Sequence, residues 1–252
     1  MLKDQIVSFD ERRDLFIAQD HKSAIAFAVE HWIHTAQRSI QQRGRFAVAL
    51  SGGSTPKAIY QALVQKNVPL DWSKVWLFWS DERSVPPHHP DSNYKMAMEA
   101  FSQVPIPPNQ IFRMEAESNI EQRATEYEEK IKHYLDKHLF DLVMLGVGED
   151  GHTASLFPKT AALAIEDHLV VPNFIPEMNT WRMTLTFPCI HTSSHIAIYA
   201  LGPSKQTIIP QVLQAAIQSP FPASRLGTPD RKVLWILDPD AAVKIEPTPP
   251  LQ

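Results

Sequence analysis

The chain has 252 residues, 44% of them apolar, so it is long enough to bury a sizeable core. Its 24 basic and 28 acidic side chains leave a net charge of −4, which gives no electrostatic reason to expect nucleic acid or an anionic membrane as a partner. The single cysteine, Cys189, excludes an intramolecular disulfide, and no apolar run reaches the roughly 18 residues of a membrane span. Because the charged amino terminus lacks the apolar stretch of a signal peptide, we expect a soluble, cytoplasmic protein.

In chain order, the spacing of apolar residues predicts a helix over 23–44, strands over 45–50 and 75–80, helices over 94–101 and 119–138, strands over 141–145, 168–172, 181–188 and 195–201, a helix over 204–217 and a last strand over 233–238. Gly44 is typical of a glycine cap, and Pro210 is expected to break or kink its helix. The tail "EPTPPLQ" (246–252) is expected to be flexible. With no repeat and no long linker, residues 1–245 are expected to form a single domain.

Nearly continuous apolar strands that alternate with helices predict an α/β fold with a mainly parallel sheet, covered on both faces. Such sheets bind ligands beyond the carboxyl ends of their strands. Three loops, "SGGSTP", "SDERSVP" and "GVGEDGHTAS", each directly follow a predicted strand. We therefore expect the three loops to meet in one crevice.

The first loop has the features of an anion-binding turn. Its candidate phosphate-binding residues are Ser51, Gly52, Gly53, Ser54 and Thr55. The glycines allow backbone N–H groups to face a ligand, the hydroxyls add donors, and the following helix adds its positive end. We expect Ser54 or Thr55 to cap that helix, with Pro56 at its first position. An ordinary tight turn explains the same residues, and the pattern of a Walker loop is absent.

Acidic and basic side chains leave the second strand together in "WSDER". If the extended conformation continues, Asp81 and Arg83 share one side and Glu82 takes the other. One of these sets then faces the crevice, and a solvated charged turn is the alternative.

The third loop contains the G-x-G-x-x-G pattern of dinucleotide-binding proteins, as Gly146, Gly148 and Gly151. Glu149 and Asp150 occupy the positions that lie near a pyrophosphate in that motif, where their charges would repel it. Asp150 is better placed to accept a ring N–H of His152, which fixes the tautomer and raises the basicity of the imidazole. We therefore interpret the loop as presenting an Asp–His general base, whose activity falls as His152 becomes protonated, and expect no nicotinamide cofactor.

Other polar residues carry weaker signals. His31 and His34 lie one helical turn apart, but without a further ligand we expect surface positions and no metal site. Arg182 and Lys205 lie near strand boundaries, where a guanidinium or an ammonium suits a phosphate. The histidines without an identifiable partner are His88, His89, His191 and His195.

Together these segments resemble the 6-phosphogluconolactonase family. The resemblance is carried, from about Phe46 to Leu237, by "LSGGSTPKAIY", "WSDERSVPPHHPDSNY", "GVGEDGHTASLFP", "RMTLTFP", "GPSKQ" and "LWILD". It implies the fold of the glucosamine-6-phosphate deaminase and ribose-5-phosphate isomerase group, a three-layer α/β sandwich with a Rossmann-like sheet. It also implies hydrolysis of 6-phospho-D-glucono-1,5-lactone to 6-phosphogluconate, the second step of the oxidative pentose phosphate pathway, with His152 at the catalytic position. Lys159 and Thr160 depart from the pattern, because many relatives are expected to have a glycine after "SLFP".

A lactone is a reactive ester, so one positioned base that deprotonates water, with donors at the carbonyl oxygen, is sufficient and no metal or cofactor is needed. We assign His152 as the base and Asp150 as its orienting partner. Arg83, with Asp81, is a candidate for contacts to the oxyanion or the sugar. The proposed phosphate and substrate cradle consists of the loop 51–55, Arg182 and Lys205. Which cation binds phosphate stays open, and we expect a monomer.

Three alternatives remain. Glucosamine-6-phosphate deaminases have a loop that resembles G-H-I-A-F-N-E-P, with a glutamate five residues after the histidine; here that position is Phe157, which cannot take a proton. A non-catalytic sugar-phosphate sensor has no need of an oriented base. The third alternative is an NAD-dependent dehydrogenase, and only the glycine pattern supports that interpretation.

Overall fold

The structure is a computed structural model that describes residues 6–66, 69–135 and 139–245. The expected flexible tail, 246–252, lies outside the described residues, as do the last three residues of the helix expected over 119–138. In the described part, the main sheet has the strand order β1 (Val7–Ser8), β2 (Arg13–Ile17), β10 (Val233–Leu237), β9 (Ile196–Ala200), β6 (Leu142–Leu145), β3 (Phe46–Leu50) and β4 (Val75–Trp79). Only the edge strand β1 is antiparallel to its neighbour, so the prediction of a mainly parallel sheet is confirmed.

A second, antiparallel sheet contains β5 (Asp81–Arg83), β8 (Thr180–Leu185) and β7 (Val170–Ile175) in that order. The sequence analysis predicted strands over 168–172 and 181–188 without assigning their partners, and the structure pairs β7 and β8 with each other in this second sheet. Only residues 176–179 connect the two strands, and Asn179 takes a left-handed conformation with φ 46°. A connection this short permits a hairpin but not the longer crossover that parallel strands need.

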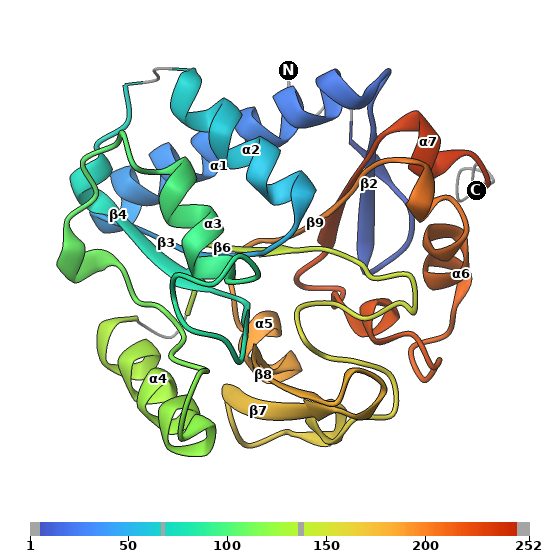
Figure 1. The fold of residues 1–252 in the computed structure, drawn as a ribbon. Helices are drawn as coiled ribbons and strands as arrows, with labels where there is room; N and C mark the ends of the chain where they lie inside the picture. The colour runs from blue at the N-terminus through green and yellow to red at the C-terminus, as the bar shows by residue number, and fades with distance from the viewer. Residues whose placement is uncertain (1–5, 67–68, 136–138, 246–252) are drawn as a thin grey trace.

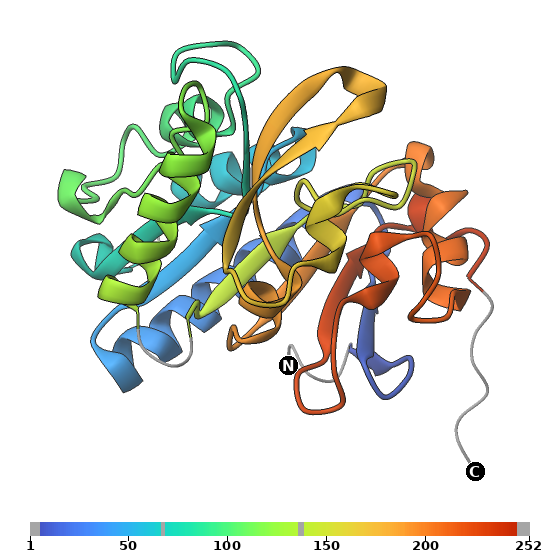
Figure 2. The same cartoon turned by 90° about the horizontal axis from the view of Figure 1, so that it is seen from below.

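The helices are α1 (His21–Arg43), α2 (Ser54–Gln65), α3 (Asn93–Ala100), α4 (Ile120–Tyr134), α5 (Phe187–His191), α6 (Ile208–Gln214) and α7 (Pro239–Ala242). Figures 1 and 2 show three layers: α1 and α2 lie on one face of the main sheet, and the small sheet with α4 and α5 lies on the other. The glycine cap of the first helix is confirmed, because Gly44 ends α1 with φ 73°. The helix expected over 204–217 is broken, because the 3₁₀ turn Pro203–Lys205 is separate from α6, which begins at Ile208. Pro210 lies in the first turn of α6, where a missing N–H costs little.

The start of α2 differs from the prediction. Gly53 is the N-cap, with φ 103°, and Pro56 is the third helical residue. Neither Ser54 nor Thr55 caps the helix. The chain enters α2 through a residue with positive φ, and that residue is Gly53, because glycine adopts a positive φ without a steric penalty. The first N–H groups of α2 therefore have no side-chain cap.

The core lies between the layers and includes the buried rings of Trp32, Trp79 and Trp235. Cys189 is a free, buried cysteine, and burial raises the pKa of its thiol, as expected for an inert side chain.

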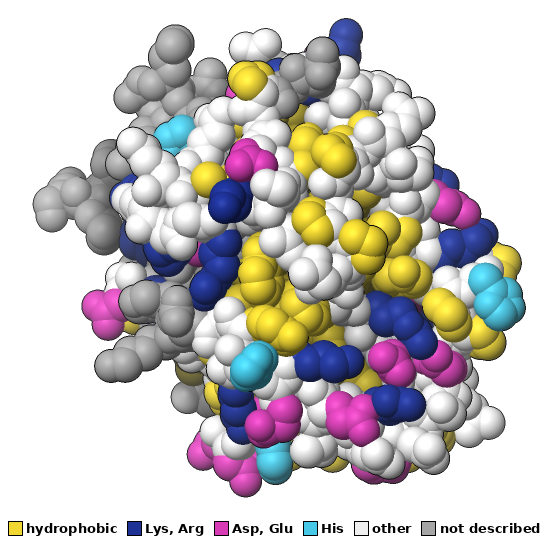
Figure 3. All heavy atoms as spheres, turned by 90° about the vertical axis from the view of Figure 1, so that its left-hand side faces the viewer, with side chains coloured by type: hydrophobic (Ala, Val, Ile, Leu, Met, Phe, Trp, Pro, Cys, Tyr) yellow, Lys and Arg dark blue, Asp and Glu magenta, His cyan; other side chains and the backbone are white. Residues whose placement is uncertain are grey.

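None of the helices in the described ranges has the length and apolar character needed to cross a membrane. On the face shown in Figure 3, basic and acidic side chains are interspersed around a central group of apolar ones.

Candidate active site

The three loops meet, as expected, in a cavity of about 310 Å³ at the carboxyl ends of β3, β6 and β9. The sequence-predicted residues that line it are Ser51, Gly52, Asp81, Arg83, His152, Arg182 and Lys205. Asp150 lies beside His152 and faces a neighbouring cavity. Gly53, Ser54 and Thr55 are not among the lining residues; they continue from Gly52 into the first turn of α2.

His152 and Asp150 form a hydrogen-bonded pair. Nδ1 of His152 lies 2.6 Å from Oδ1 of Asp150, and the same oxygen accepts the backbone N–H of His152 at 3.0 Å. Burial acts to raise the pKa of Asp150, but the hydrogen bonds from the His152 ring and backbone outweigh it and hold that pKa below its ordinary value. Asp150 is therefore a carboxylate at neutral pH, and a carboxylate accepts the N–H of Nδ1. With Nδ1 occupied, Nε2 is the nitrogen left to take a proton.

The glycines of this loop create the space for that pair. A Cβ at Gly148 would lie 2.1 Å from Nδ1 of His152 and 2.8 Å from Oδ1 of Asp150. Gly151 has φ 78°, and a Cβ there would lie 2.7 Å from the ring of Phe221. These contacts explain Gly148 and Gly151 without a dinucleotide, because the missing side chains leave room for the histidine and for a tight turn, whereas a Cβ at Gly146 would meet nothing within 4 Å.

Phe157 fixes the other side of the histidine. Its ring stacks on the imidazole of His152, with centroids 3.9 Å apart and planes 22° apart. The loop between them is tied to β8, because the backbone N–H of Ser155 donates to Oγ1 of Thr184 at 3.1 Å. The side chain of His152, 28% exposed, is therefore reachable from the cavity but restricted in orientation.

The "DER" segment alternates as predicted. Asp81 and Arg83 line the cavity, whereas Glu82 points away and is buried. Glu82 accepts backbone N–H groups of Asn93 and Tyr94, each at 2.8 Å, and so anchors the start of α3. Burial raises the pKa of Glu82 despite these hydrogen bonds.

Asp81 connects three loops. Its Oδ2 accepts the hydroxyl of Ser155 at 2.7 Å, and its Oδ1 accepts the side-chain amide of Asn93 at 3.3 Å. Asn93 in turn lies against Gly52, where a Cβ would come within 1.9 Å of the Asn93 side chain. The glycine loop, the "DER" strand and the histidine loop are therefore held together around one buried carboxylate.

Three cations line the cavity: Arg83, Arg182 and Lys205. Arg83 and Arg182 are neighbours across β5 and β8, and the Nε of each is buried without a hydrogen-bond partner among the described residues. Burial lowers the pKa of Arg182, Asp81 counteracts this, and the charge of Arg83 adds to the lowering. Arg182 lies inside β8, not at its boundary as expected. Two adjacent guanidiniums with unused donors form a site suited to an anion.

Sequence reasoning did not single out Asn93, Ser155 or Met178, which also line the cavity, and it gave Phe157 no role beside the histidine. Asn93, Ser155 and Phe157 fall inside the segments that carry the family resemblance, which is the signal that could have found them. Met178, in the turn of the β7–β8 hairpin, has no such signal. No group of three or more potential metal ligands occurs within residues 6–66, 69–135 and 139–245.

A mainly parallel sheet with an oriented histidine and three cations at its carboxyl edge is typical of an enzyme that acts on a small anionic substrate. The family model described as glucosamine-6-phosphate isomerases/6-phosphogluconolactonase matches residues 19–235. The chain belongs to this family.

Relatives with curated names agree with the family. The chain is 42% identical to the 6-phosphogluconolactonase of Chlamydia muridarum over 93% of this chain and 91% of that protein. It is 34% identical to the 6-phosphogluconolactonase of Nostoc sp. over 93% of this chain and 99% of that protein. Among solved structures, 6-phosphogluconolactonase from Trypanosoma brucei has a TM-score of 0.81 at 26% identity and covers 92% of this chain and 98% of its own. The expected fold is therefore confirmed.

Proposed function

We propose that this protein hydrolyses 6-phospho-D-glucono-1,5-lactone to 6-phosphogluconate, the second step of the oxidative pentose phosphate pathway. The names of the relatives support the reaction. The observation that carries the mechanism is the 2.6 Å contact between His152 and Asp150 at a cavity lined by three cations. Phe157, five residues after the histidine, stacks on it and cannot take the proton-transferring role of the deaminase glutamate.

In the proposed mechanism, Nε2 of His152 takes a proton from water as the water oxygen attacks the lactone carbonyl carbon. Asp150 orients the ring and stabilises the imidazolium. The tetrahedral intermediate then expels the ring oxygen, which receives the proton from His152, and the carboxylic acid that forms loses its remaining proton to solvent and leaves as a carboxylate. Both steps use one side chain, so no metal or cofactor is required.

The cations are proposed to divide the negative charge of the substrate. Arg83, Arg182 and Lys205 bind the 6-phosphate and the oxyanion that develops on the carbonyl oxygen. The N–H groups at the start of α2, over residues 53–55, have no side-chain cap among the described residues and are a further proposed phosphate contact. Asp81, whose two oxygens already accept hydrogen bonds, is proposed as a positioning residue. Replacing each cation by alanine separates the roles: a phosphate contact raises KM, and an oxyanion contact lowers kcat.

The first experiment is lactone hydrolysis, with the lactone generated in situ and the spontaneous rate subtracted. Wild type is compared with His152→Ala and with His133→Ala, which removes an exposed histidine on α4. We expect acceleration by wild type and His133→Ala, and a loss of roughly 100-fold or more for His152→Ala. A folded His152→Ala with wild-type turnover contradicts the base assignment, and an inactive wild type contradicts the reaction and calls for the deaminase assay.

We also propose a cytoplasmic monomer without a nucleic acid partner. The net charge of −4 gives no electrostatic reason for a nucleic acid partner. Light scattering across a range of protein concentrations tests the monomer, and cell fractionation tests the location.

A further inference from the structure

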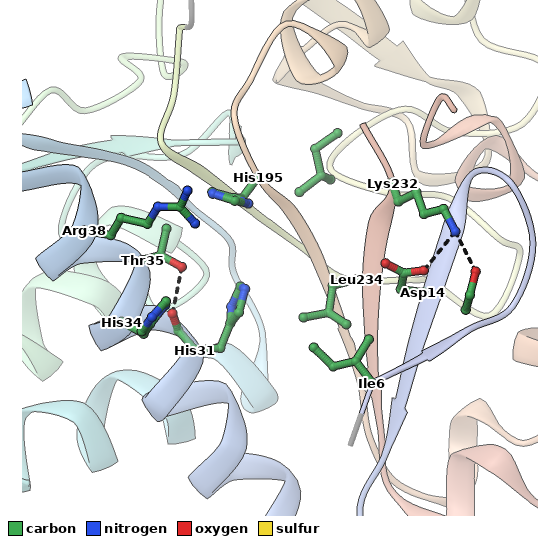
Figure 4. A pocket seen from close by; sticks show the side chains of 11 residues that line it. Ile6, Asp14, His31, His34, Thr35, Arg38, His195, Lys232 and Leu234 are labelled. Carbon is green, nitrogen blue, oxygen red and sulfur yellow. Dashed lines mark hydrogen bonds and ion pairs between the residues drawn. The ribbon is translucent and has the colours of Figure 1, made fainter. Parts of the chain in front are cut away.

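A second cavity, of about 470 Å³, lies at the opposite edge of the main sheet and is called here the amino-edge cavity. His195, which directly precedes β9, and Lys232, which directly precedes β10, both line it. The middle of α1 forms the facing wall (Figure 4). Because the active site lies at the carboxyl ends of the same parallel strands, a ligand in this cavity would not touch the substrate.

The amino-edge cavity combines an apolar wall with polar side chains. Ile6, Ile196 and Leu234 supply the apolar surface. Across from Leu234, Arg38 projects from α1 toward His195 (Figure 4). A cavity of this size, largely apolar with a few convergent polar groups, is typical of a small-molecule site.

Of the two cations that line this cavity, one is neutralised. Nζ of Lys232 lies 3.2 Å from Oδ1 of Asp14 and donates to Oγ of Ser8 at 2.6 Å. Arg38 makes no hydrogen bond or ion pair with residues in the described ranges. An unpaired guanidinium beside an apolar wall is suited to a planar anion, which it can hold through two parallel hydrogen bonds.

His31 is not the plain surface residue that the sequence analysis expected. Its Nδ1 is buried and has no hydrogen-bond partner among the described residues, and the ring of Phe27 lies parallel to it at 6.5 Å. Burial, with smaller contributions from His195 and His34, lowers the pKa of His31 to about 4, so the ring is neutral at physiological pH. A buried polar atom without a partner is unfavourable, and a bound molecule can supply one.

We propose that the amino-edge cavity binds a small organic carboxylate with an apolar body, the carboxylate on Arg38 and the body against Ile196 and Leu234. A carboxylate is favoured over a phosphate because no glycine turn and no helix N-terminus contributes to this cavity to supply the backbone donors that phosphate sites use. One unpaired cation also balances one negative charge. The site is separate from the proposed catalytic function and does not depend on it.

The test uses the full chain with isotope-labelled Ile and Leu methyl groups, titrated at constant ionic strength and followed by NMR. The probes are benzoate, its neutral analogue benzamide and inorganic phosphate. We expect benzoate to shift the methyl signals of Ile196 and Leu234 saturably, and Arg38→Gln to weaken that binding roughly tenfold, the usual effect of losing one charge-assisted contact. Lys22→Gln, which removes an exposed charge from the same helix, leaves the affinity unchanged.

Two further variants separate this cavity from the active site. Arg38→Gln is expected to retain lactone hydrolysis, because Arg38 lies at the other edge of the sheet. Arg182→Gln is expected to leave the benzoate shifts at Ile196 and Leu234 intact. The proposal is overturned if benzamide binds as well as benzoate, if phosphate binds more tightly, if Arg38→Gln keeps full affinity, or if Arg182→Gln abolishes the shifts.

Discussion

Gly148→Ala tests whether the glycine loop exists to accommodate the Asp–His pair. The added Cβ would lie 2.1 Å from Nδ1 and 2.2 Å from Cε1 of His152, whereas ordinary contacts begin at 3.4 Å. The imidazole therefore has to move by more than an ångström. Gly148 is not among the glycines with a left-handed φ, so the backbone accepts alanine without strain.

The expected effect falls on catalysis and not on folding. A misplacement of about 1 Å in a catalytic group costs on the order of 100-fold in rate. The displaced group is the end of a flexible, partly exposed side chain, so the loss in unfolding free energy is about 1 kcal/mol or less, the net worth of one hydrogen bond. The assay is kcat for lactone hydrolysis, paired with a urea titration of the same preparation.

Two comparisons make this reasoning refutable. If Gly148→Ala acts through the histidine, adding it to His152→Ala causes no further loss in kcat. Gly146→Ala, whose Cβ meets nothing within 4 Å, leaves His152 in place and changes at most KM. Wild-type kcat in Gly148→Ala, or a further loss in the double variant, would refute the role of this glycine.

Three other predictions follow from single observations. Lys159 has φ 61°, so Lys159→Gly is expected to raise the unfolding free energy in urea by about 0.5–1 kcal/mol, and a decrease would count against strain at this position. Burial acts to raise the pKa of Asp238, but hydrogen bonds from Gly202, Ala241 and His21 hold it below its ordinary value. That stabilisation is complete above the unfolded pKa of ~3.9 and is lost as pH falls through the folded pKa, so the stability deficit of Asp238→Asn should shrink in acid; a deficit that grows in acid contradicts this. We propose that residues 1–245 form one domain, and expect coincident unfolding transitions by tryptophan fluorescence and far-UV circular dichroism; separate transitions would indicate two units.

Much of the fold could be predicted because its central strands are buried on both faces and therefore apolar throughout. β3 and β6 are of this kind: each was predicted from four or five consecutive apolar residues, and all of those residues are buried. β2 was missed because its sequence, "RDLFI", begins with two charged residues and its strand partner β10 lies more than 200 residues away. No local pattern reports such a pairing. The pairing of β7 with β8 was not predicted, because strand periodicity does not specify the partner.

The candidate site likewise contains some residues that could be predicted from the sequence and others that could not. His152, Arg83 and Lys205 were found because charged or titratable side chains directly after apolar strands stand out in a sequence. A helix after the glycine loop was predicted correctly, but its cap was not, because the prediction assigned the cap to a hydroxyl residue where a positive φ required Gly53. His31 was misassigned because it lines a cavity together with residues at the starts of β9 and β10, which lie far along the chain.

The residues that sequence patterns miss are those that hold the site rigid. His152 is partly exposed, but Ser155, Asn93 and Asp81 are at most 7% exposed. A buried carboxylate is tolerated only when its oxygens are hydrogen-bonded, so Asp81 requires the donors supplied by Ser155 in the histidine loop and Asn93 at the start of α3. Those donors come from ordinary serine and asparagine residues, which no charge pattern or apolar periodicity selects. Because losing either donor would leave a buried charge undercompensated, the scaffold constrains the relative positions of the glycine, "DER" and histidine loops more strongly than the exposed chemical groups do.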